Sequence, residues 1–210
     1  MDAARDQILR SIRENLARSA RDAVTHAPSD HAPPKPRVPS PEPLDAVERF
    51  TSQLEAVGAH WTLVRGEVEA ARALRRILSD AGAKRVAGSD APLVARVLPG
   101  RLTGLSRDEL FTCDAGVTTA QWGIAETGTL VLESARERSR LASLVPPIHI
   151  ALLSTNRICA SLGDALARVD VTSHAITLIT GPSRTSDIEL TLVVGVHGPQ
   201  TVHVLLLEEE

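Results

Sequence analysis

The segment Gly123–Thr129 places a single carboxylate, Glu126, between small and hydroxyl-bearing residues, immediately before an apolar run. Gly128 permits a tight turn, so the Glu126 carboxylate and the hydroxyl and backbone N–H groups of Thr127 and Thr129 can converge on a small polar ligand. A carboxylate placed in this way suits a nucleophile, a base or an anchor. The alternative is an ordinary hairpin turn, in which the threonine hydroxyls satisfy backbone groups and Glu126 faces water.

A second segment, residues 180–189, has the pattern of a loop that joins a strand to a helix. The N-terminus of a helix presents unpaired N–H groups and a positive partial charge, which suit a carboxylate or a phosphate. Arg184 adds a guanidinium that can clamp such an anion in a bidentate manner. We therefore predict an anion site from Gly181, Ser183, Arg184, Thr185 and Asp187. The alternative is a capping box between Ser186 and Glu189, which needs no ligand.

A third segment, Gly195–Pro199, places His197 in a turn. A histidine titrates near neutral pH, so His197 can serve as an acid, a base or a hydrogen-bond donor to a ligand, with a structural role as the alternative. His149 and His203 fall in expected strands and are interpreted as packed or edge residues. No histidine pair has the ligand spacing of a helical metal site, and the two cysteines form no metal-spaced pair, so no metal site is predicted.

Hydrophobic periodicity predicts strands that alternate with helices. Helices are expected over residues 44–57, 68–78, 155–167 and 183–192, with another that starts near Asp90 and Pro92. Strands are expected over residues 61–64, 85–87, 116–120, 129–133, 148–153, 175–179 and 201–207. This alternation favours an α/β fold with a largely parallel sheet and helices on its faces.

The sequence divides into three regions. Ile8, Ile12 and Leu16 recur every four residues and predict an N-terminal amphipathic helix within residues 1–19. Residues 20–43 are rich in proline and form an expected extended linker, and residues 44–210 form the main domain. The N-terminal helix is expected to pack on its own domain or on a second subunit, with docking to another protein as the alternative.

Composition excludes several classes of protein. The 210 residues are 43% hydrophobic and 23% charged, which is typical of a globular domain and not of a disordered chain. A formal charge of -3 and an aromatic content of 2% give little basis for a nucleic-acid surface. No apolar run approaches the roughly 20 residues that span a bilayer, and no signal peptide is evident, so we expect a cytoplasmic location and no membrane span.

The three segments, taken together and in this order, resemble the lactate-utilization protein C family, also called the LUD-domain or YkgG family. The resemblance extends over about residues 44–207. It implies a three-layer α/β/α domain of the group that contains ribose-5-phosphate isomerase, glucosamine-phosphate deaminase and the CoA-transferases. It also implies a role in the oxidation of L-lactate to pyruvate with iron–sulfur partner proteins. The clusters are expected in those partners, and no cofactor is expected in this chain.

Three functional hypotheses follow. The first is a subunit of a lactate-oxidation system that binds a small anionic ligand, either as a single copy or as a homo-oligomer. The second is a free-standing enzyme that acts on a sugar phosphate or an acyl-CoA through Glu126, because the CoA-transferases of this fold group use a glutamate near a glycine-rich turn as nucleophile. The third is a scaffold that docks its partners through the N-terminal helix.

Overall fold

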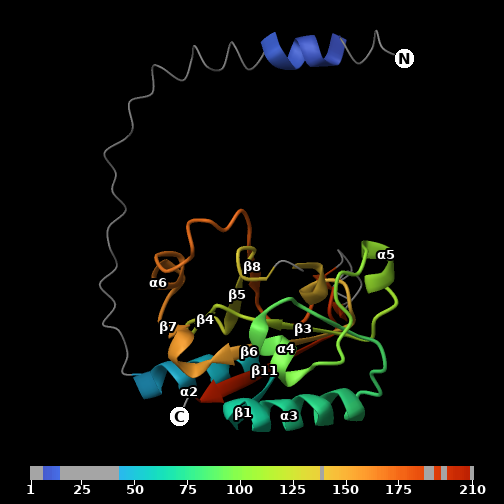
Figure 1. Cartoon of the computed structure of the whole chain (residues 1–210). Coiled ribbons are helices and arrows are strands. Elements are labelled where there is room, and N and C mark those ends of the chain that lie inside the picture. Colours follow the sequence, from blue (N-terminus) through green and yellow to red (C-terminus); the bar gives the residue numbers. More distant parts are fainter. Residues whose placement is uncertain (1–6, 15–42, 138–139, 187–191, 195–197, 209–210) are drawn as a thin grey trace. The chain divides into compact units, whose positions relative to one another are not determined.

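A computed structural model describes residues 7–14, 43–137, 140–186, 192–194 and 198–208 of the chain (Figure 1). The chain divides into two units, Met1–Pro39 and Ser40–Glu210. In the first unit, residues 7–14 are helical, and the apolar side chains of Ile8 and Ile12 on that helix are exposed. Residues 20–42 of the expected linker lie outside the described residues, and its last residue, Pro43, begins a helix; the docking role of the N-terminal helix stays a prediction.

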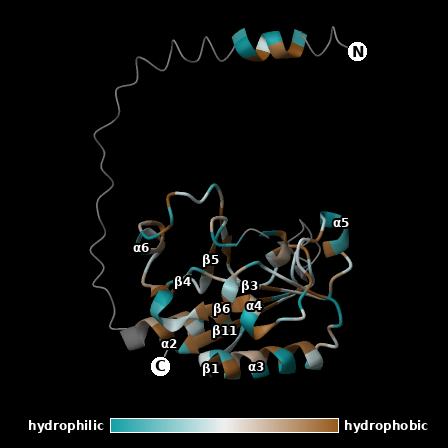
Figure 2. Cartoon of the chain, in the orientation of Figure 1, coloured by the Kyte–Doolittle hydropathy of each residue, from teal (hydrophilic) through white to brown (hydrophobic). Residues whose placement is uncertain are grey.

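Five parallel strands form the main sheet of the second unit. They are β1 (His60–Arg65), β2 (Val86–Gly88), β3 (Ala115–Thr119), β6 (Ile148–Ser154) and β11 (Thr201–Glu208), in the order β1-β11-β6-β3-β2. The central strands β6 and β11 are almost continuously apolar, as expected for strands that are covered on both faces (Figure 2). The predicted parallel sheet is therefore confirmed.

Some of the expected strands lie in a second sheet and not in the parallel one. It has the order β7-β4-β5-β8, formed by β4 (Trp122–Ile124), β5 (Thr129–Glu133), β7 (Ile158–Cys159) and β8 (Ile176–Ile179). Strand β5 runs antiparallel to both β4 and β8. The connection from β4 to β5 is a short turn, which is too short for the crossover that a parallel pair requires. The turn therefore forces a hairpin.

Helices cover the sheets. The structure has α2 (Pro43–Ala56), α3 (Gly66–Asp80), α4 (Pro92–Val97), α5 (Arg107–Leu110), α6 (Leu162–Leu166), and the 3-10 turns η2 (Arg140–Ser143) and η3 (Thr155–Arg157). The first three match predicted helices, and α5 was not predicted. Gly58 and Gly82, which follow α2 and α3, have positive φ angles of 79° and 65°, as helix-terminating glycines do.

Two predicted helices are wrong. Within residues 155–167 the chain forms η3, then β7 beside β4, and only then α6, which starts at a capping box between Ser161 and Asp164. Within residues 183–192 the structure has β9 (Arg184–Ser186), antiparallel to β10 (Leu192–Val194). Several β-branched residues in this segment favour a strand, and pairing between the two halves outweighs the apparent helix signal.

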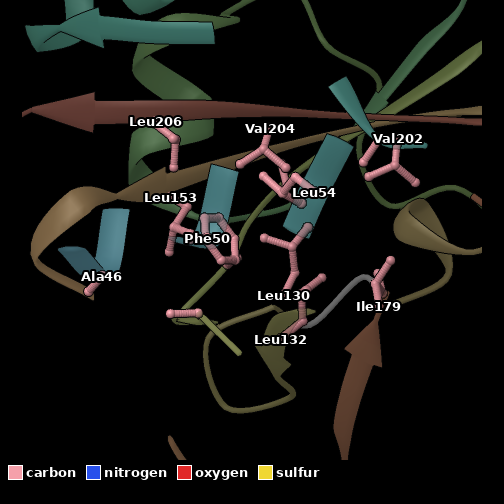
Figure 3. Close-up of a cluster of buried hydrophobic side chains, with 14 residues drawn as sticks. Ala46, Phe50, Leu54, Leu130, Leu132, Leu153, Ile179, Val202, Val204 and Leu206 are labelled. Carbon is pink, nitrogen blue, oxygen red and sulfur yellow. The ribbon is translucent and has the colours of Figure 1, made fainter. Parts of the chain in front are cut away.

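The main sheet is the middle one of three layers. On one face, α3 and α4 pack against β3, β6 and β11, and their core includes Leu74, Val94 and Ile150. On the other face, α2 and the second sheet share a core with β6 and β11 (Figures 1 and 3). The third layer is therefore a helix combined with a sheet. None of the helices in the described part of the chain is long and apolar enough to cross a membrane.

Candidate functional site

The Glu126 segment forms the turn of the β4–β5 hairpin, which is the structural alternative that the sequence left open. Glu126 is exposed, and its Oε1 accepts a hydrogen bond of 3.0 Å from the backbone N–H of Leu162 at the start of α6. Gly128 has a φ angle of 64°, and a Cβ atom there would lie 2.7 Å from the backbone of Gln53. The turn is therefore pressed against α2. The catalytic role of Glu126 stays a prediction.

Threonine hydroxyls connect the first two predicted segments. The Thr129 hydroxyl lies 2.7 Å from the Thr127 hydroxyl and 2.7 Å from that of Thr180. Gly181 follows Thr180, and a Cβ atom on Gly181 would lie 2.7 Å from the Val57 carbonyl oxygen at the end of α2. The structure thus brings together the hairpin and the loop after β8, as the anion-site prediction requires.

The Arg184 guanidinium already has a protein partner in this region. Its Nη2 donates a hydrogen bond to the Val57 carbonyl oxygen, a favourable place for a cation because carbonyl groups are unpaired at the end of a helix. No helix begins at Ser183, so the anion-binding argument that relied on a helix N-terminus is wrong. For Thr185 only the backbone in β9 is described. Asp187 and His197 lie outside the described residues.

One hollow contains part of the predicted anion site. It measures about 730 Å³ and lies at the amino ends of β6 and β11, where Gly181, Ser183 and Gly198 contribute to its lining. Its described lining contains apolar and uncharged residues without a charged side chain. Neither Glu126 nor Arg184 belongs to that lining. This hollow therefore lacks the charge that would hold an anion.

A different hollow, of about 490 Å³, lies at the carboxyl ends of the parallel strands. We call it the carboxyl-edge hollow. Its lining includes polar residues at or just beyond the ends of β3 and β6, together with three arginines: Thr119, Gln121, Ser154, Arg136, Arg157 and Arg168. Ligands of open α/β sheets commonly bind at this edge, and the volume lies within the usual range for ligand sites. The carboxyl-edge hollow is the candidate functional site.

Two of these arginines, Arg157 and Arg168, lie against the ring of Trp122. The guanidinium carbon of Arg157 lies 4.8 Å from the centre of the Trp122 ring, and that of Arg168 lies 5.6 Å away. Arg168 also donates a hydrogen bond of 2.8 Å to the Cys159 sulfur. Neither arginine pairs with a carboxylate among the residues that the structure describes, whereas Arg136 lies 3.8 Å from Asp170. Arg157 and Arg168 are thus the positive groups available to an anionic ligand in a hollow whose lining also includes the carboxyl groups of Glu133 and Asp170.

A buried carboxylate, Glu133, holds Trp122 in place. Glu133 Oε1 accepts a hydrogen bond of 3.0 Å from the Trp122 indole N–H. Its Oε2 accepts hydrogen bonds from the backbone N–H of Asp170 at 2.8 Å and from the Ser173 hydroxyl at 3.2 Å. A carboxylate with this many donors is stable when buried. Glu133 is therefore a structural support of the hollow.

A second buried carboxyl group, Glu137, lies behind the wall of the carboxyl-edge hollow. Its Oε1 accepts hydrogen bonds from both the backbone N–H and the hydroxyl of Thr119. Burial raises the pKa of Glu137, and the nearby hydroxyl groups of Thr119 and Ser89 counter part of that rise. No group of three potential metal ligands was found among the described residues.

Comparison with known proteins gives relatives along most of the chain. A family model of the LUD domain matches residues 103–207. An uncharacterized protein of Neisseria meningitidis is 42% identical over 106 residues, which are 48% of this chain and 46% of that protein. Lactate utilization protein C of Deinococcus radiodurans is 33% identical over 184 residues, which are 82% of this chain and 85% of that protein. The chain thus spans about half the length of the first relative and most of the second.

A solved structure supports the fold. The crystal structure of a DUF162 family protein from Deinococcus radiodurans aligns with a TM-score of 0.61 at 24% sequence identity, and the alignment covers 79% of this chain and 98% of that one. At this level of identity the likeness concerns the fold alone. It agrees with a mixed α/β domain in which helices flank a parallel sheet.

Proposed function

The chain belongs to the LUD-domain family, that of lactate utilization protein C and YkgG, and from this premise we propose that it serves in the utilization of L-lactate. In this proposal the chain binds a small carboxylate anion in the cytoplasm, and iron–sulfur partner proteins carry the electrons of the oxidation of lactate to pyruvate. The names of several relatives support the lactate context.

The observation that carries the ligand proposal is the pair of arginines beside Trp122 in the carboxyl-edge hollow. A guanidinium group matches the geometry of a carboxylate and binds it with two parallel hydrogen bonds. Lactate and pyruvate each carry one carboxylate and one further oxygen. The Gln121 amide, which uses one of its two N–H groups in the bond to Thr119, supplies a donor for that further oxygen.

The carboxyl-edge hollow is large enough to hold the acid together with another molecule. A volume of about 490 Å³ exceeds the needs of a three-carbon acid. The remaining space suits water or a group contributed by a partner protein. This arrangement agrees with a chain that binds the acid while the electrons leave through another subunit.

Calorimetric titration with pyruvate tests this function through Arg157→Ala. We expect this variant to bind pyruvate about ten- to a hundredfold more weakly, because a hydrogen bond to a charged group contributes about 1.5–3 kcal/mol. The melting temperature should remain near that of the parent chain, since Arg157 is exposed and its side chain makes no ion pair among the described residues.

Two matched variants make the titration specific. Arg75→Ala removes an exposed arginine of α3 that does not line the carboxyl-edge hollow, and it should leave pyruvate affinity unchanged. Arg184→Ala removes the contact with the end of α2 and should lower the melting temperature without a change in affinity. Loss of pyruvate binding in Arg184→Ala with normal binding in Arg157→Ala would instead support the site at the loop after β8.

A further inference from the structure

Glu137 is a buried acid with an unusual set of contacts. Its side chain is 1% exposed, and its two hydrogen bonds from Thr119 both reach the same oxygen, Oε1. The other oxygen, Oε2, is fully buried and meets no donor at hydrogen-bonding geometry within the described part of the chain, although the Ser89 hydroxyl lies near enough to lower the pKa of Glu137. A buried carboxylate oxygen without a donor is costly, whereas a protonated oxygen at the same position carries no charge.

Two segments join Glu137 to the carboxyl-edge hollow. Thr119 lines the hollow and donates to Glu137, so a single hydrogen bond separates the buried acid from the lining. On the other side lies the loop after β2, in which Ser89 and Asp90 interact with Glu137 while the next residue, Ala91, lines the hollow. The acid therefore lies directly behind the wall that a ligand would contact.

The charged groups near Glu137 determine how its pKa changes when an anion binds in the carboxyl-edge hollow. Asp90, an acidic residue of the loop after β2, adds to the rise in the pKa of Glu137. Arg101 approaches the same loop and donates a hydrogen bond of 3.1 Å to the Ser89 carbonyl oxygen. On the side of β3 the facing groups are the uncharged Thr119 and Gln121, which is hydrogen-bonded to the Thr119 hydroxyl at 3.0 Å. An anion in the hollow would add another negative charge on that side and raise the proton affinity of Glu137 further.

We propose that Glu137 takes up one proton from solvent when a carboxylate anion binds in the carboxyl-edge hollow, and that Thr119 connects the acid to the bound anion. The inference rests on the proposed function. The proton binds to the Glu137 carboxylate, no covalent bond to the ligand forms, and the net charge added to the hollow is zero. Glu137 is thus a positioning residue that makes anion binding depend on pH.

The experiment measures pyruvate binding by titration calorimetry from pH 5 to 8, in pairs of buffers that differ in ionisation enthalpy. The difference between buffers gives the number of protons taken up per pyruvate. We expect this number to approach one in the parent chain at the pH values where free Glu137 is ionised. In that range the dissociation constant should rise about tenfold for each unit of pH.

Two variants, one at Glu137 and one at Thr119, distinguish proton uptake coupled to anion binding from a purely structural role of Glu137. Glu137→Gln keeps the shape of the side chain but cannot titrate, so proton uptake should vanish and affinity should become nearly independent of pH. Thr119→Val removes a hydroxyl that lowers the pKa of Glu137, so the onset of the affinity loss should move to higher pH. Glu48→Gln, an exposed change on α2, should behave as the parent chain does.

The outcomes separate this inference from the function on which it rests. Pyruvate binding with the same proton uptake in Glu137→Gln as in the parent chain would overturn the role of Glu137 and leave the proposed function intact. Unchanged proton uptake per pyruvate in Thr119→Val, over the pH range in which its free Glu137 is ionised, would overturn the role of Thr119 as the connector. Absence of pyruvate binding in the parent chain would contradict the proposed function and, with it, this inference.

Discussion

Phe50→Ala is expected to lower the free energy of unfolding by about 3–5 kcal/mol, the usual effect of removing a buried aromatic ring. Phe50 lies on α2, is 0% exposed and belongs to the core between the two sheets, near Leu54, Leu130 and Leu153 (Figure 3). A Cβ atom on Gly123 of β4 would lie 3.1 Å from the Phe50 ring. The ring thus fills the space between α2, the main sheet and the hairpin.

Urea unfolding measures this effect, and Phe111→Ala provides the matched control. Phe111 follows α5 and is 63% exposed, so the same chemical change there should cost less than about 1 kcal/mol. Equal losses in the two variants would contradict the packing of α2 between the sheets. A loss in Phe50→Ala that is confined to the second sheet would mean that the two sheets do not share one core.

Acidification from pH 6.5 to pH 4 is expected to remove about 3 kcal/mol of stability through His149 alone. His149 is fully buried in β6, and burial lowers its pKa from 6.5 to about 4. Its Nε2 lies 2.9 Å from the Thr118 hydroxyl. Below pH 6.5 the unfolded chain binds a proton at this histidine, whereas the folded chain binds it only near pH 4. The stability is therefore complete above pH 6.5 and falls as the pH falls.

Urea unfolding at several pH values tests this dependence with His149→Gln. The variant should be less stable at neutral pH but should lose much less stability on acidification. His174→Gln changes an exposed histidine and should keep the full pH dependence of the parent chain. Burial, together with the neighbouring His60, also lowers the pKa of His203 to about 4; because His203 is only partly buried, solvent screening makes its contribution in the same direction smaller. An unchanged pH dependence in His149→Gln would contradict the assignment to His149.

The sequence predicted the main sheet because its strands carry their own signal. Strands β6 and β11 are runs of aliphatic residues that are bounded by turn residues, and such runs predict buried strands without knowledge of their partners. The helices α2 and α3 combine apolar periodicity with a terminating glycine. In these elements the local pattern and the tertiary environment favour the same state.

The second sheet could not be predicted because its short strands depend on distant partners. Ile158 and Cys159 become a strand only because they lie beside Gly123 and Ile124. The pair of β9 and β10 likewise depends on pairing across residues 187–191, which lie outside the described residues. Cap residues in these segments suggested helices, and strand pairing determined the outcome.

The candidate site, like the fold, could be predicted only in part from the sequence. The hairpin at Glu126 and the loop at Gly181 do meet, through the Thr129 and Thr180 hydroxyls, so the order of the motifs was informative. Sequence reasoning missed the arginines of the carboxyl-edge hollow, because Arg136, Arg157 and Arg168 come from separate segments without a common motif. One available signal was the polar residue at the carboxyl end of each apolar strand, as at Thr119 and Ser154.

The most direct test of the central claim is to map the backbone amides of the ¹⁵N-labelled chain by NMR during titration with pyruvate. The carboxyl-edge hollow predicts concentration-dependent shifts at Thr119, Gln121 and Arg157, with little change at the β4–β5 turn. Shifts confined to Glu126, Thr127, Gly181 and Ser183, with the carboxyl-edge amides unmoved, would contradict the account and return the site to the two motifs of the sequence.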